Sequence, residues 1–177
     1  MTERLDVPSG RPAFPLSLLV AAVAFVALGA WFALDGRDPA AGVAVLVGLA
    51  LLVGGGRSAR AMGSPGVMFT DSAVERICDA ALLAAIAWSR LDVAPRVATA
   101  ALIALVTSYL ASYLRAKSTG LGFDLEESMV DRSVLLGAPA VGLVGGLVEP
   151  GLWVAVAWSS IVAVKRAFEA ATQGEPG

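Results

Sequence analysis

The 177-residue chain contains no histidine and a single cysteine, Cys78. Without histidine there is no Ser-His-Asp triad, no histidine general base and no histidine-ligated zinc. A single cysteine excludes an internal disulfide and any cysteine-cluster metal site. Charged residues are also scarce, at 16% of the chain, whereas a soluble domain carries about a quarter. The few charges must therefore be interpreted by their positions.

Apolar residues are what the chain has in excess, at 57% of its length, and this is the composition of a membrane protein. A transmembrane helix needs about 20 mainly apolar residues. Segments that approach or reach this length are 14–34, 40–53, 71–88, 95–114, 133–148 and 150–168. We therefore expect an all-α fold, an integral membrane bundle of six transmembrane helices over residues 14–168, with short tails at residues 1–13 and 169–177.

Two glycine-containing segments are expected to end or join these helices. The second span should close on the glycines 54–56, and a tight turn at 149–151 should connect the last two spans, because glycine and proline punctuate helices. Another small-residue group, Gly142, Gly145 and Gly146, offers a close-packing face, either within the chain or in a homodimer.

Lysine and arginine positions predict the orientation, because they are enriched in cytoplasmic segments of membrane proteins. With a cytoplasmic amino terminus, ten of the thirteen fall on that side: Arg4, Arg11, Arg57, Arg60, Arg76, Arg115, Lys117, Arg132, Lys165 and Arg166. We therefore predict that both termini are cytoplasmic and that the protein lies in the cell membrane. Nucleic acid is not an expected partner, because the net charge is −2 and no long basic run occurs.

Three carboxylates at the start of the third span stand out. Asp71, Glu75 and Asp79 are spaced four residues apart, so each step turns by only about 40° and all three share one helix face. Carboxylates in a membrane segment are costly and usually face water, a cation or a metal, and such hard ligands suit Mg²⁺ or Mn²⁺. In the alternative interpretation, Asp71 only caps the helix and Glu75 pairs with a nearby arginine, which leaves Asp79 without a partner.

Two further segments combine small residues with cations. Residues 54–60 place three glycines before two arginines, and glycine allows close approach of a phosphate that arginine can bind. Residues 112–122 place Arg115 and Lys117 before two glycines, where they could bind an anionic substrate. The alternatives are a glycine-rich helix end with orienting arginines, and cations that contact lipid head groups.

Together these segments resemble the CDP-alcohol phosphatidyltransferases, particularly the branch of phosphatidylglycerophosphate and phosphatidylinositol-phosphate synthases. The family signature is DxxDGxxAR, about eight residues, then GxxxDxxxD. Residues 56–60, GRSAR, are similar to its GxxAR part, and Asp71 and Glu75 stand for its third and fourth aspartates.

The downstream segments extend the resemblance. Residues 112–117, SYLRAK, followed by GLG at 120–122, are similar to the branch's SYxRAR and GLG, and 131–132 occupies the place of an ER pair.

The resemblance implies transfer of a phosphatidyl group from a CDP-linked lipid to a small, phosphorylated alcohol, with release of CMP. It implies Mg²⁺ or Mn²⁺ at Asp71 and Asp79, with Glu75 as the general base. The nucleotide side would be held by Gly56, Arg57, Ala59 and Arg60. The acceptor phosphate would be bound by Arg115, Lys117 and Arg132.

One departure from the signature keeps a second function open. Its first two aspartate positions fall on Leu52 and Gly55, which have no metal-ligating group. The alternative is therefore a catalytically inactive member of this fold, a lipid- or nucleotide-binding subunit or the heterodimer partner of an intact paralogue. A small transporter is a third class, disfavoured because the acids lie near one surface and no two halves with matching broken helices are seen.

Overall fold

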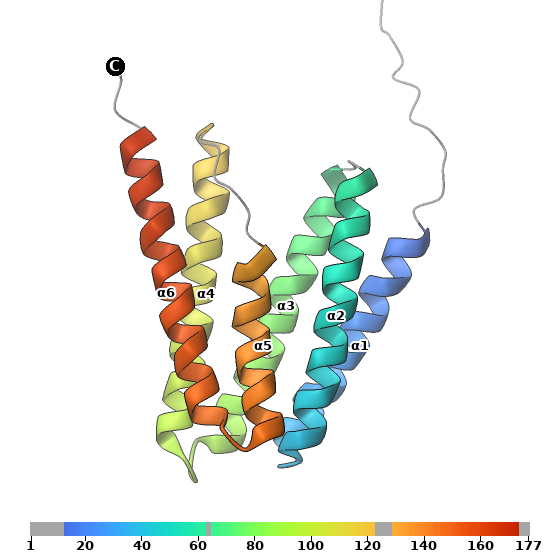
Figure 1. Cartoon of the computed structure of the whole chain (residues 1–177), viewed down its shortest axis with the longest axis vertical. Coiled ribbons are helices and arrows are strands. Elements are labelled where there is room, and N and C mark those ends of the chain that lie inside the picture. The colour runs from blue at the N-terminus through green and yellow to red at the C-terminus, as the bar shows by residue number, and fades with distance from the viewer. Residues whose placement is uncertain (1–12, 63–64, 123–128, 174–177) are drawn as a thin grey trace, which may run out of the picture.

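A computed structural model describes residues 13–62, 65–122 and 129–173 of the chain. Side chains at 13–15, 59–62, 65, 67–68, 129–132 and 173 lie outside this description. The described residues form six α-helices, shown in Figure 1: α1 (Ala13–Leu34), α2 (Asp38–Met62), α3 (Pro65–Arg90), α4 (Pro95–Gly120), α5 (Met129–Gly145) and α6 (Val148–Gln173). The predicted all-α bundle of an integral membrane protein is confirmed.

Within the described residues, four helices are long and apolar enough to cross a membrane: α1, α2, α4 and α6, with mean hydropathies from 2.3 in α1 down to 1.3 in α6. The apolar part of α5 is shorter, at Ser133–Gly145. The helix α3 differs because it carries acids at positions 71, 75 and 79, so only residues 80–88 are continuously apolar. Long apolar helices suit a membrane because a helix satisfies its own backbone hydrogen bonds in lipid.

The boundaries between α2 and α3 differ from those predicted. The helix α2 continues through the three glycines to Met62, and α3 begins at Pro65, six residues before Asp71. Asp71 therefore lies within α3, and the interpretation of Asp71 as its N-terminal cap is wrong. Proline favours the first helical position because its missing N–H is not needed there, which explains the earlier start.

The turn between α5 and α6 also lies elsewhere than predicted. The chain reverses at Gly146, whose φ is +71°, and the Leu147 amide donates to the Gly142 carbonyl at 2.7 Å. Residues 149–151 belong to the first turn of α6, where proline removes no hydrogen bond. A Cβ at Gly142 would lie 2.6 Å from the Leu147 carbonyl oxygen, so Gly142 serves contacts within the chain.

The helices pack as a connected bundle. The helix α1 lies against α2 and α3, α4 lies against α3 and α6, and α5 lies against α2 and α6. Close approach depends on small residues: a Cβ on Gly42 would come within 2.5 Å of the Ala140 carbonyl oxygen, and one on Gly151 within 2.5 Å of that of Ala138. The core between the helices contains fully buried aliphatic side chains: Leu52, Leu82, Leu83, Ile86, Leu136, Leu143 and Leu152.

The two ends of the bundle differ in which helix ends they bring together. At one end lie the starts of α1, α3 and α5 and the ends of α2, α4 and α6 (Figure 1). At the other end an ion pair between Asp38 and Arg90 joins the start of α2 to the end of α3. The three segments predicted to carry chemistry therefore all lie at the first end, which we call the site end.

Candidate functional site

The acidic face of α3, defined as Asp71, Glu75 and Asp79, turns into the protein. These side chains keep only 7%, 5% and 1% of their surface exposed, respectively. Burying a carboxylate costs several kcal/mol (order of magnitude) unless a cation and hydrogen bonds compensate. The face therefore requires positive charge close by.

Arg76 supplies such a charge from the same helix. Its Nη1 lies 2.9 Å from Asp79 Oδ2 and its Nη2 lies 3.9 Å from Glu75 Oε2. The hydroxyl of Tyr109 on α4 donates to the Arg76 carbonyl at 3.0 Å and so joins α4 to this turn of α3. The expectation that a structural role would leave Asp79 without a partner is wrong, because Arg76 is its i,i+3 neighbour on one helix face.

The end of α2 presents glycines and an exposed arginine. Gly55 and Gly56 are buried, Arg57 is exposed, and the Ser58 hydroxyl donates to the Gly54 carbonyl at 3.0 Å. The side chains of the predicted nucleotide-binding residues Ala59 and Arg60 lie outside the described residues.

The two non-acidic positions of the signature are structurally distinct. Leu52 is completely buried, at 0% exposure, and belongs to the apolar core. A Cβ on Gly55 would meet only Leu18 Cβ of α1, at 3.6 Å, which is an ordinary contact. Neither position supplies a donor atom from its side chain.

The end of α4 carries the predicted acceptor-binding cations. Arg115 is half-buried, and Lys117 is exposed with its ammonium 5.8 Å from the centre of the Tyr113 ring. The helix ends where the Leu121 amide bonds the Lys117 and Ser118 carbonyls, and Gly122 follows with φ +87°. The side chain of the third predicted cation, Arg132, lies outside the described residues.

A buried cation was not among the predicted site residues. Arg166 on α6 is only 9% exposed, and its Nη1 donates to the Ala111 carbonyl of α4 at 2.9 Å. Ala111 lies one helical turn before Arg115, so two arginines from different helices lie near one turn of α4. The signal in the sequence was the cation pair Lys165 and Arg166 within the last predicted span, since a charged residue inside a span usually faces the interior.

The arrangement does not by itself form a metal site. Among the residues that the structure describes, no three aspartate, glutamate, cysteine or histidine side chains lie close enough together to hold an ion. Asp71 and Asp79 are eight residues apart, a rise of about 12 Å along a helix, which is too far for one ion to bind both. The metal role of these two residues stays a prediction.

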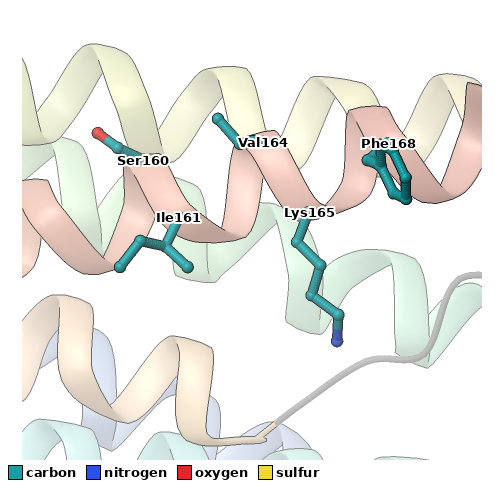
Figure 2. A pocket seen from close by; sticks show the side chains of 5 residues that line it. All are labelled: Ser160, Ile161, Val164, Lys165 and Phe168. Carbon is teal, nitrogen blue, oxygen red and sulfur yellow. The ribbon is translucent and has the colours of Figure 1, made fainter.

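A groove on α6 has a different character. It has a volume of about 510 Å³ and is lined by Ser160, Ile161, Val164, Lys165 and Phe168, all from this helix. Figure 2 shows Ile161 and Lys165 extending to the same side of the ribbon, and Lys165 Nζ lies 3.5 Å from a Glu169 carboxylate oxygen. No acid lines the groove, so it is apolar surface separate from the acidic face.

Comparisons with known proteins agree with the motifs. No protein-family model matches the chain. The phosphatidylinositol phosphate synthase of Corynebacterium glutamicum is 33% identical over 105 residues, which cover 54% of this chain and 48% of that protein. The chain thus spans about half the length of this curated relative.

Solved structures show the same fold. The phosphatidylinositol phosphate synthase of Mycobacterium tuberculosis with CDP-DAG bound has a TM-score of 0.70 and 22% identity, over 89% of this chain and 86% of that one. The same enzyme in complex with manganese and citrate has a TM-score of 0.69 and 23% identity, over 89% and 80%. The predicted resemblance to the CDP-alcohol phosphatidyltransferases and to this branch is confirmed.

Proposed function

Because the chain resembles the CDP-alcohol phosphatidyltransferases in motifs and fold, we propose that it transfers a phosphatidyl group from a CDP-linked lipid to a small, phosphorylated alcohol. The observation that carries this proposal is the buried acidic face of α3, which shares the site end with the glycine-arginine end of α2 and the basic end of α4. The binding of CDP-DAG by a structural relative supports the donor.

The proposed reaction needs a base and bound phosphates. Glu75 takes the proton of the acceptor hydroxyl, whose oxygen attacks the lipid-bearing phosphorus as the bond to CMP breaks. The Glu75 carboxylate is buried, and its Oε2 lies 3.9 Å from Arg76 Nη2. CMP leaves with the bonding electron pair.

Cations of the site end hold the two substrates. Gly56 and Ala59 would allow the nucleotide close to α2, while Arg57 and Arg60 bind its phosphates. Arg115, Lys117 and Arg132 would bind the phosphate of the acceptor alcohol. No step passes through Mg²⁺ or Mn²⁺, because the described carboxylates do not complete a metal site. The manganese in a relative's structure makes metal dependence a necessary arm of the assay.

The test is CMP release by membranes that contain the protein. They are supplied with CDP-diacylglycerol, with Mg²⁺, Mn²⁺ or chelator, and with glycerol 3-phosphate or inositol phosphate. We expect release that is lost in Glu75→Gln and in Asp71→Asn, and retained in the control Glu169→Gln, whose carboxylate lies on α6. Release that survives Glu75→Gln would refute the assignment of the base.

A second candidate is a catalytically inactive member of this fold. The observation favouring it is the apolar pair on α2, where Leu52 is fully buried and Gly55 has no side chain. Such a protein would bind a CDP-lipid without releasing CMP and would copurify with an intact paralogue or as a homodimer. No CMP release from folded wild-type protein, together with copurification of a paralogue, would select this candidate.

The proposed location is the cell membrane, with the site end in the cytoplasm. This follows from the lysines and arginines predicted on that side, because positive residues are retained there. Substrates with nucleotide and phosphate groups would then be reached from the cytoplasm.

A further inference from the structure

The acidic face of α3 must be neutral enough to stay inside an apolar bundle. Its deepest member, Asp79, is 1% exposed, and its neighbours in the core include the buried Cys78 and Leu82. An uncompensated carboxylate at this depth would destabilise the fold strongly. The compensating charge is therefore part of the folded structure, whatever substrate is bound.

Arg76 has the geometry for this task. One terminal nitrogen of its guanidinium lies 2.9 Å from Asp79 Oδ2, and the other lies 3.9 Å from Glu75 Oε2. A planar fork can serve two carboxylates at once, which a lysine ammonium does less well. The side chain is 25% exposed, so its charge acts in a largely desolvated environment.

The arginine is also fixed from a second helix. The Tyr109 hydroxyl of α4 donates to the Arg76 carbonyl at 3.0 Å. Arg76 lies inside α3, where backbone carbonyls also accept hydrogen bonds within the helix. This contact joins the turn of α3 that carries Arg76 to α4, and so restrains the backbone position from which the Arg76 side chain extends.

The two α2 positions at which the signature has aspartates offer no side-chain ligand for a metal. Leu52 is apolar and fully buried, and Gly55 has no side chain. In the described part of the chain no three potential ligands gather. We propose that Arg76, in place of a divalent ion, is the resident counter-cation of Glu75 and Asp79, so that these two carboxylates of the substrate-free protein are compensated without metal. The inference rests on the proposed function only in taking this face as the site.

The experiment measures thermal unfolding and Mn²⁺ binding of the full chain in detergent, without nucleotide or acceptor. Mn²⁺ alone is the probe, and its free concentration is followed by electron paramagnetic resonance. Arg76→Gln is compared with the control Arg57→Gln, an exposed arginine at the same end of the bundle. The double variant Arg76→Gln with Asp79→Asn removes both charges of the pair.

We expect Arg76→Gln to lower the unfolding midpoint by roughly 6 to 20 °C, and Arg57→Gln to change it by no more than about 2 °C. The double variant should recover part of the loss, because Asp79, the carboxylate nearest to Arg76, no longer leaves a buried charge without its cation. Mn²⁺ should raise the midpoint of Arg76→Gln and leave that of the wild type unchanged. If Arg76→Gln does not accumulate, accumulation of the double variant carries the same conclusion.

Two results would overturn the inference. One is saturable Mn²⁺ binding to the wild type that raises its midpoint and disappears in Asp79→Asn. The other is an Arg76→Gln midpoint within the range of the Arg57→Gln control. Since no substrate is present, either result leaves the CMP-release assay to decide the proposed function separately.

Discussion

Replacing Gly42 by alanine should weaken the contact between α2 and α5, whereas the same replacement at Gly54 on the same helix should not. A Cβ at Gly42 would lie 2.5 Å from the Ala140 carbonyl oxygen and 2.6 Å from Val144 Cγ2. At Gly54 nothing beyond the local helix lies within 4 Å of the added carbon. The pair therefore separates a packing effect from a backbone effect.

The expected difference in stability between the two variants contains no helix-propensity term, because that term is the same at both positions and cancels. Glycine to alanine inside a helix gains about 0.8–1.0 kcal/mol at either position. Only Gly42→Ala adds the cost of overpacking, about 1–3 kcal/mol, because backbone atoms cannot move aside cheaply. Gly42→Ala should therefore be less stable than Gly54→Ala by about 1–3 kcal/mol, or about 2–12 °C in unfolding midpoint for a chain of this size.

Intrinsic tryptophan fluorescence during heating in detergent measures both midpoints in one protocol, because the chain has four tryptophans. Gly54→Ala serves as the matched control for helix propensity and for handling. A midpoint of Gly42→Ala equal to or above that of Gly54→Ala would refute the close approach of α2 and α5 that the fold requires.

Two further predictions concern arginine contacts, and a third concerns the orientation in the membrane. Arg166→Met should lower the unfolding midpoint more than its neighbour Lys165→Met, because Arg166 loses a buried charged hydrogen bond worth about 1.5–3 kcal/mol; equal midpoints would contradict the α4–α6 contact. A double-mutant cycle of Asp38→Asn and Arg90→Gln should give a coupling free energy of unfolding of at most about 1 kcal/mol, because both side chains are about a quarter exposed. A larger coupling free energy would indicate a buried pair. Tags at the two termini should be cleaved by protease only in inside-out vesicles, and cleavage in intact cells would reverse the proposed orientation.

Apolar run length was enough to predict the helical bundle, but not where helices end. The glycines 54–56 were expected to end α2, yet the helix continues through them to Met62. Helix propensity penalises glycine in water, whereas a helix surrounded by lipid and neighbouring helices keeps its hydrogen bonds regardless. Likewise 149–151 looked like a turn, although a proline in the first turn of α6 costs no hydrogen bond.

Within the site, spacing predicted the shared face of the three acids but not their partners. The buried state of Asp71, Glu75 and Asp79 agrees with an inward face. The pairing of Asp79 with Arg76 depends on the rotamer of the long arginine side chain. The i,i+3 spacing allows this contact but does not determine the rotamer. The contact of Arg166 with Ala111 joins residues 55 positions apart, so only the packing of α6 on α4 could reveal it.

The helix α1 carries none of the predicted site residues, yet it lies against both α2 and α3. Those two helices touch each other far less than either touches α1, and they are tied together at the far end by Asp38 and Arg90. Because α1 packs against both helices, its side chains contribute to the separation between the glycine-arginine end of α2 and the acidic face. In the proposed enzyme, a change in side-chain volume on α1 would alter this separation, and with it the fit of the substrate, without changing a predicted site residue.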